Sequence, residues 1–439
     1  MFSDYVESGP SLLNPTIGKL RAKFTFKGNV TLANTLRRMI VSATPSVGFR
    51  TEPAEKSEIS ISVNTTPLVN EIIAHRIGMI PILADPESFN PSQYEFVLDK
   101  ENTTSEMMDV RASDFRVLMK DPANPLEPPT EIPTKEFFPP DPISGETTLI
   151  TRLRPQWNQS APNERIALKA KASISTGAEN IRWSPISQCS YEYTQDKTPE
   201  HVEAVFTNWL LLTKKIEKPE EVMTDKLAEL KREFNTMEIQ RCYITNDRGE
   251  PIDFTFYVES VGTQSIPFIV STALRACTAL VRKYEDLDAT IPESVTLKPG
   301  DARYSCTDVV FQGEAHTLGN LLEAYLVENH VDGSAQPRIT YAGYKVPHPL
   351  RAEMFVRIGA EQDMTNNIAT GESEFQMARQ AISSVCRGLR DQFRQLDASW
   401  AGLFAPPPTP TPTPAVIAAP TQVKVKAKAK PKATQPIPA

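Results

Sequence analysis

Residues 30–41 read VTLANTLRRMIV, and residues 316–327, far along the same chain, read HTLGNLLEAYLV. The two stretches share a threonine, an asparagine, two leucines and a valine at matching positions. In both, apolar residues recur every three or four positions, which predicts an amphipathic helix, with Thr31 as the N-cap of the first. Each helix follows a turn, Phe26-Lys27-Gly28 or Phe311-Gln312-Gly313. A strand, a turn and a helix are therefore repeated within one chain.

The segments around each helix extend this repeat. In the first half we predict strands over residues 19–28 and 57–63 and a long helix over residues 266–287. In the second half we predict strands on both sides of a proline turn at residues 347–349 and a helix over residues 375–396. The shared order predicts an α+β fold in which two copies of one small dimerisation domain pack together as a pseudo-dimer.

The middle of the chain has a different character. Between residues 84 and 205, strand-like runs such as YEFVLD alternate with proline-rich breaks such as NPLEPPTEIP, which predicts a mostly β domain inserted into the first half. Thr66-Pro67 predicts a helix start, MIPIL at 79–83 a short buried strand, and residues 220–236 a helix leading out. The predicted domains are a first dimerisation domain (15–66 and 238–290), an inserted β-rich domain (67–237), a second dimerisation domain (291–400) and a tail (401–439).

The charge of the chain is unevenly distributed. Residues 405–439 hold five lysines and no acidic residue, and their proline, threonine and alanine content predicts a disordered tail. The remaining chain has 42 basic and 54 acidic residues, a net charge of −12. A body this acidic is a poor match for phosphate binding and favours a protein partner. The tail could contact nucleic acid or an acidic protein surface, or serve only as a solubilising linker.

The sequence carries no motif for catalysis or metal binding. Its five cysteines stand singly without a CxxC pair, which predicts free thiols in a reducing compartment. No GxxxxGKS/T, HExxH or GxSxG motif occurs. We therefore expect no catalytic residue, no cofactor and no metal. The first ten residues do not read as a secretory signal, and no apolar run approaches the ~20 residues of a membrane span.

Two combinations of motifs resemble one known family. In the first half, FKGNVTLANTLRRMIVSATPSVGF and AHRIGMIPI are similar to the alpha-type subunit of multisubunit DNA-dependent RNA polymerases, and so is ALKAKASISTGAENIRWSPIS in the inserted domain. This subunit is the D subunit of archaea and the third-largest subunit of eukaryotic polymerase II. In the second half, HTLGNLLEAYLV and AGYKVPHPL resemble its small L-type partner. The resemblance covers about residues 15–400, and a fused chain of this kind resembles what large cytoplasmic DNA viruses encode.

The resemblance implies a non-catalytic assembly platform for transcription. The implied partners are the two largest polymerase subunits and small accessory subunits, with DNA reached only through the complex and no membrane. The implied location is the host cytoplasm and virion for a viral protein, and otherwise the nucleus or cytoplasm with the polymerase. Many relatives carry a cysteine cluster for zinc or iron–sulfur in the inserted domain. Because only Cys189 occurs there in this chain, we expect no metal cluster.

The resemblance and the helical periodicity together name candidate interface residues. The candidates for contact with partner subunits are Asn34, Arg37, Arg38, His75 and Arg76. The candidates for packing between the two halves lie on the apolar faces of the long helices: Val270, Leu274, Val281, Ile382, Val385 and Leu389. In the second copy Glu323 and Ala324 stand where the first has Arg37 and Arg38, so the two helices would offer unlike chemistry to unlike partners.

Simpler interpretations stay open for several of these residues. Arg37 and Arg38 could form a solvated basic face, His316 could cap its helix, and His348 could only shape a turn. Cys277 and Cys386 are expected to be ordinary buried residues. The alternative function is a free-standing DNA-binding transcription regulator that acts through the basic tail, although the acidic body and the lack of a recognition motif disfavour it.

Overall fold

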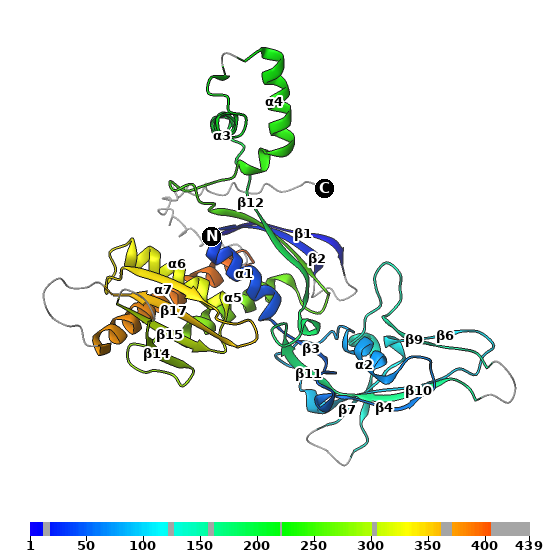
Figure 1. Cartoon of the computed structure of the whole chain (residues 1–439). Coiled ribbons are helices and arrows are strands. Elements are labelled where there is room, and N and C mark those ends of the chain that lie inside the picture. Colours follow the sequence, from blue (N-terminus) through cyan, green and yellow to red (C-terminus); the bar gives the residue numbers. More distant parts are fainter. Residues whose placement is uncertain are drawn as a thin grey trace, which may run out of the picture. The chain divides into compact units, whose positions relative to one another are not determined.

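The computed structural model describes residues 1–11, 18–121, 127–156, 162–219, 222–300, 305–360 and 371–404 (Figure 1). The tail predicted from the sequence lies outside these residues from 405 onward. Two similarly built halves, which we together call the platform, hold the repeated stretches. A β-domain and a helical hairpin are inserted in the first half.

The first half of the platform is an antiparallel sheet covered by two helices. Its strands, in order across the sheet, are β1 (Phe2–Ser11), β2 (Lys19–Lys27), β13 (Asp253–Ser260) and β12 (Ile186–Tyr193). The helices are α1 (Val30–Ser42) and α5 (Ile266–Arg282). In β2, Ala22, Phe24 and Phe26 are buried, while Lys23 between them is exposed and Thr25 is half-buried, so the alternation of the sequence turns one face of the sheet toward the helices.

The second half repeats this plan. Its strands, in order, are β14 (Val295–Pro299), β15 (Cys306–Gln312), β17 (Glu353–Gly359) and β16 (Tyr341–Lys345). Its helices are α6 (His316–Leu326), continued by a π-helical turn over Val327–Val331, and α7 (Gly371–Gly402). The strand that leads into the short helix lies second in each sheet, next to the strand that precedes the long helix. The predicted α+β class with two related halves is confirmed.

One hydrophobic core joins the two halves. The long helices α5 and α7 pack against each other, and α1 contacts α6. All six residues expected to pack between the halves are buried in this core. At its edge the Trp400 ring of α7 packs against Phe2 (centroids 5.1 Å apart) and Phe24 (4.9 Å), and its indole N–H donates to the Pro267 carbonyl of α5 (3.0 Å). The two halves therefore share one interior.

The β-domain has a core of its own, built around Phe49, Phe96 and Phe115. Its main sheet has the order β4 (Ile59–Asn64), β10 (Arg165–Ala170), β5 (Tyr94–Glu101), β7 (Arg116–Met119) and β8 (Thr130–Ile132). Two strand pairs and one helix complete it: β3 (Pro45–Phe49) with β11 (Ala172–Thr176), β6 (Met108–Arg111) with β9 (Leu149–Leu153), and α2 (Asn70–Gly78).

The sheets divide the chain at different points from the predicted domain boundaries. Strand β4 was expected in the first dimerisation domain and pairs instead with β10 of the β-domain. Strand β12 was expected in the inserted domain and pairs instead with β13 of the platform. Strand β1 precedes residue 15, the predicted start, and pairs with β2. Strand pairing joins distant segments, so a local pattern can find a strand without finding its neighbour.

The helical hairpin consists of α3 (Pro199–Leu212) and α4 (Thr224–Met237), which lie side by side in Figure 1. A small separate core of Phe206, Trp209 and Phe234 holds them together. Both ends of the hairpin join the platform, where the Asp196 N–H donates to the Cys242 carbonyl (2.8 Å). Helix α3 was not predicted, because the strand-like runs and proline-rich breaks between residues 84 and 205 suggested continued β structure.

Several local predictions need correction. Residues 79–83 form no strand; a turn at Met79 follows α2, and Ile80 and Ile82 are buried in the β-domain. Helix α5 ends at Arg282 rather than Leu287, and turns follow it. The short helical turns are Ala54–Lys56, Pro91–Gln93, Ala112–Asp114, Thr134–Glu136, Ile181–Trp183 and Ile239–Arg241. Within the described residues, no helix combines the length and apolar character of a membrane span.

Candidate partner-docking surface

Helix α1 is fixed in orientation by its cap and its apolar face. The Asn29 Oδ1 accepts from the Leu32 N–H (2.8 Å), so Asn29, not the predicted Thr31, is the N-cap. Leu32, Leu36 and Ile40 are fully buried against the platform core. With this face inward, Asn34 and Arg37 lie half-buried on the rim, and Arg38 is exposed.

Asn34 and Arg37 form one unit on this rim. The Arg37 Nε and Nη2 both donate to the Asn34 Oδ1, at 3.1 and 3.0 Å. Among the described residues, no ion pair joins Arg37 to a carboxylate. The side chain is therefore held in place by a neutral amide, and its charge remains available to a partner.

Arg38 has a different role from its neighbour. Its Nε donates to the Thr317 Oγ1 of α6 (2.8 Å), which ties the first repeated helix to the second. Adjacent residues of a helix point about 100° apart, so Arg37 and Arg38 leave α1 in different directions. Of the two predicted arginines, only Arg37 carries a charge that is free of contacts to the other half.

His75 and Arg76 lie on α2, in the β-domain. Both are exposed, and the Arg76 Nη2 donates to the Leu149 carbonyl of β9 (3.0 Å). The other side of this helix buries Ile73 and Ile77 in the β-domain core. The five predicted interface residues thus belong to two surfaces on separate cores.

Contacts between α6 and β16 explain why the motifs HTLGN (316–320) and AGYK (342–345) occur together. A Cβ at Gly319 would overlap the Tyr344 ring of β16, so this position requires glycine. The His316 Nδ1 lies 3.2 Å from the Tyr344 hydroxyl, and His316 makes no capping bond; Ala315 is the N-cap. His348 accepts from the Leu350 N–H (3.1 Å) within the turn. Glu323, at the position of Arg37, is half-buried, and burial raises its pKa.

The two halves meet at an acidic groove of about 720 Å³. Its charged lining residues are Arg248, Glu250, Glu323, Glu328 and Asp332. Arg248 lies 3.8 Å from Asp332, which leaves the lining with an excess of carboxylates. The groove beside α6 is therefore lined mainly by negative side chains, whereas α1 presents the positive Arg37.

Sequence reasoning missed one side of the surface around Arg37. A pocket of about 450 Å³ is lined by Arg37 together with residues 189–193 of β12. Burial raises the pKa of the Cys189 thiol to about 12, opposed by the nearby Arg37 charge, and burial likewise raises the pKa of Tyr191. The run CSYEYT was identified as a strand, but nothing local placed it beside α1.

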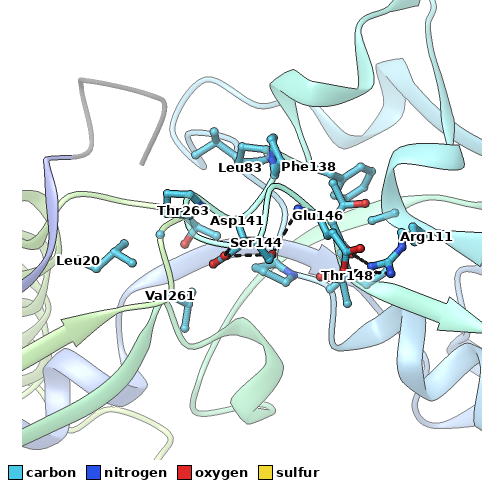
Figure 2. A pocket seen from close by; sticks show the side chains of 18 residues that line it. Leu20, Leu83, Arg111, Phe138, Asp141, Ser144, Glu146, Thr148, Val261 and Thr263 are labelled. Atoms are coloured by element: carbon cyan, nitrogen blue, oxygen red, sulfur yellow. Dashed lines mark hydrogen bonds and ion pairs between the residues drawn. The ribbon is translucent and has the colours of Figure 1, made fainter. Parts of the chain in front are cut away.

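A further pocket, of about 370 Å³, is shown in Figure 2. Its charged groups are engaged by neighbours: Glu146 lies 3.0 Å from Arg111, and the Asp141 carboxylate accepts from the N–H groups of Ile143 and Ser144. These backbone bonds hold the pKa of Asp141 below its usual value. The charges here stabilise a turn and a strand end.

The last features of the candidate site are the cysteines and any side chains that could act as metal ligands. Cys277 and Cys386 are fully buried in the platform core, as expected, and burial raises the pKa of both thiols. None of the five cysteines, all of which lie within the described residues, forms a disulfide. In the part of the chain that the structure describes, no group of three or more His, Cys, Asp or Glu side chains could hold a metal ion.

Comparison with known proteins finds a family model that matches most of the second half. Residues 306–398, which run from β15 into α7, match the RNA polymerase Rpb3/Rpb11 dimerisation domain. The chain is 26% identical over 174 residues to DNA-directed RNA polymerases I and III subunit rpac1 of Dictyostelium discoideum, covering 36% of this chain and 45% of that protein.

Two further relatives are matched over longer stretches. The human RPAC1 subunit of RNA polymerases I and III is 25% identical over 289 residues, covering 59% of this chain and 78% of that protein. The Rpo3 subunit of Pyrococcus furiosus RNA polymerase is 24% identical over 265 residues, covering 58% of this chain and 87% of that protein. In other relatives the chain spans about half of their length, between 45% and 57%. The chain therefore has homologues among the Rpb3/Rpb11-type, alpha-like subunits of DNA-directed RNA polymerases.

Proposed function

We propose that this chain is a non-catalytic assembly subunit of a DNA-dependent RNA polymerase. A D-like half and an L-like half, joined in one chain, pair with each other and dock the two largest subunits. The observation that carries this proposal is the single core shared by the two halves, in which α5 packs on α7. Tethered partners reach effective concentrations on the order of mM, so the joined halves pair without depending on expression level.

The docking of the large subunits is proposed to use unlike surfaces of the two halves. Arg37, held by Asn34, offers a positive contact on α1, and the groove beside Glu323 offers a negative one. His75 and Arg76 are proposed as a separate contact of the β-domain, which would also receive the small accessory subunits. DNA is reached only through the assembled complex.

The proposed source and location follow from the same function. A fused D-like and L-like chain fits the large cytoplasmic DNA viruses inferred from the sequence, with the protein in the host cytoplasm and the virion. In a cellular organism the chain would reside in the nucleus or cytoplasm with the polymerase.

Co-expression with the two largest polymerase subunits tests the proposal. We expect all three chains to co-purify and Arg37→Glu to weaken the association by about 2–5 kcal/mol, or roughly thirty-fold and more, because a like charge replaces a complementary one. Arg38→Glu should act mainly on the bond to Thr317. Arg232→Glu, at an exposed arginine of α4, is the matched control and should co-purify normally.

Each part of the proposal has its own contrary result. Full recovery of the large subunits by Arg37→Glu would remove Arg37 from the interface. Failure of the wild-type chain to recruit either large subunit would refute the assembly function.

A further inference from the structure

Strand β12 ends the first sheet of the platform with an open edge. The Thr194 N–H donates to the Asp253 carbonyl (2.9 Å), and the ladder with β13 is regular from Gln188 to Tyr193. In an antiparallel ladder, the N–H and C=O of one residue point to the same side, and the side alternates along the strand. The backbone groups of Cys189, Tyr191 and Tyr193 therefore point away from β13, and no strand among the described residues pairs with them.

Edge strands of natural sheets are normally protected against pairing by prolines, lysines, bulges or short length. Strand β1 contains Pro10 and two register shifts, β14 ends in Lys298-Pro299, and β16 has five residues, including Lys345. The β-domain sheet ends in β8, of three residues, and in β4, whose ladder is interrupted by a register shift.

Strand β12 has none of these protections along its regular part. Its sequence ISQCSYEY contains no proline, glycine or lysine, and its one register shift lies at the start, between Ile186 and Gln188. The regular part spans about 20 Å at ~3.3 Å per residue. An unpaired edge of this kind, with Cys189 and Tyr191 half-buried beside α1, matches the surface to which an extended peptide adds as a new strand.

The pocket beside this edge indicates the chemistry of the added strand. Residues 189–193 and Arg37 line it together, and Arg37 is the only charged side chain there besides Glu192. The Glu192 carboxylate is already engaged by the Tyr257 hydroxyl (2.6 Å). Arg37 has only the Asn34 amide as a hydrogen-bond partner among the described residues. A carboxylate on the incoming strand would complete its pairing.

We propose that β12 is a docking edge on which an extended segment of one of the two largest polymerase subunits adds as a fifth strand, with an acidic side chain against Arg37. This inference rests on the proposed function, because it takes the partner from the same complex. It adds the mode of contact, which is main-chain hydrogen bonding to Cys189, Tyr191 and Tyr193, and the acidic character of the segment. The docking edge is continuous with the exposed rim of α1 through the shared pocket.

Hydrogen exchange followed by mass spectrometry tests the docking edge. The wild-type chain is measured alone and in the complex with the two largest subunits. We expect the amides of residues 189, 191 and 193 to exchange at least about tenfold more slowly in the complex. The amides of Ser190 and Glu192, which face β13, serve as an internal reference because they are protected in both samples.

The outcomes of this measurement separate the two proposals. Equal exchange at residues 189, 191 and 193 in the free chain and in the complex overturns the docking edge and leaves the assembly function standing. If the large subunits do not bind at all, both fall. Protection that is present in the free chain and disappears on dilution identifies a second copy of this chain as the occupant, which also overturns the proposal.

A pair of variants at one residue gives a second test. Tyr193→Pro removes an outward N–H, at a place where a strand edge tolerates proline, whereas Tyr193→Ala removes the same ring and keeps that N–H. We expect Tyr193→Pro to recover at least about tenfold less of the large subunits than Tyr193→Ala. Equal recovery by the two variants contradicts docking through the backbone, and thermal melting of both confirms that the platform is folded.

Discussion

Tyr325 links the two repeated helices by hydrogen bonds at a second place, besides the bond from Arg38 to Thr317. Its hydroxyl accepts from the Asn29 Nδ2 (3.3 Å) and donates to the Gln392 Oε1 (2.7 Å). Asn29 also caps α1, so one hydroxyl connects the start of the first helix, the end of the second and the long helix α7. Burial raises the pKa of Tyr325 to about 12, because the phenolate would lose its hydration.

This residue predicts a specific loss of stability in alkali. Between about pH 10 and 12, the unfolded state releases the Tyr325 proton while the folded state retains it, so stability falls as pH rises. The loss from this group is on the order of 2 kcal/mol. Tyr325→Phe should cost about 1 kcal/mol at neutral pH, for the lost hydrogen bonds, and then show a shallower decline above pH 10. Urea unfolding across this range measures it, and identical slopes for both proteins would contradict the assignment.

At the residue scale, the sequence predicted the buried positions better than the polar contacts. Leu32, Leu36 and Ile40 follow from helical spacing alone, since one face must enter the core. The roles of Arg37 and Arg38 could not be separated from the sequence, because the bond from Arg38 to Thr317 depends on the packing of two distant helices. The cap was misplaced because both Asn29 and Thr31 are competent N-cap residues.

Among the elements, two identical dipeptides show how context decides a helix start. Thr198-Pro199 begins α3 with proline at its first position, whereas Thr66-Pro67 lies three residues before α2. The Asn64 Nδ2 donates to the Leu68 carbonyl (2.8 Å), which holds the segment after Pro67 in a turn. The strand signals were more reliable, since alternation located β2, β4 and β12, but it could not tell which sheet each would join.

The helical hairpin is predicted to be dispensable for the stability of the platform. Its core is separate, and the chain enters and leaves at Asp196 and Cys242, which are hydrogen-bonded to each other. Replacing residues 197–241 with Gly-Gly, together with Cys242→Ser, should therefore change the unfolding free energy of the platform by no more than about 1 kcal/mol.

Urea unfolding of the shortened chain measures this change. As a control, Phe256→Ala in the same shortened chain removes a fully buried platform ring and should cost about 3–5 kcal/mol. A loss of similar size from the deletion alone would show that the hairpin supports the platform.

For the whole molecule, the covalent link between the halves is predicted to be unnecessary for their pairing. The shared core should hold residues 1–290 and 291–439 together when they are expressed as two chains, because each piece alone would expose the apolar faces of α5 or α7. We expect a one-to-one complex by size-exclusion chromatography with light scattering, and aggregation of each piece expressed alone.

Two neighbouring substitutions make this test specific. Leu274→Asp places a charge in the buried contact and should weaken the complex more than about a hundredfold. Arg275→Asp, one residue further on an exposed position, should leave the complex intact. Two stable monomers from the wild-type pieces would contradict a shared core.

The repeat was readable in the sequence because each half keeps the same local order of strand, turn and helix. The domain boundaries could not be predicted in this way, because strand pairing decides to which domain β1, β4 and β12 belong. Only part of the candidate surface could be predicted, again because strand pairing is not visible in the local sequence. Arg37 stands in a recognisable motif, whereas its neighbours on β12 are brought to it only by the folded sheet.

The contact between Phe2 and Trp400 also determines the order in which the parts of the chain can fold during synthesis. Phe2 leaves the ribosome roughly 20 to 80 s before Trp400 at ordinary rates of synthesis, yet the two rings lie only 5.1 Å apart in the finished core. The β-domain and the hairpin, whose cores use only earlier residues, can fold during that interval. The platform must wait for the last turns of α7. A chain truncated before Trp400 would then carry folded inserts on an incomplete platform, so the surfaces of the platform would form only in chains that extend through α7.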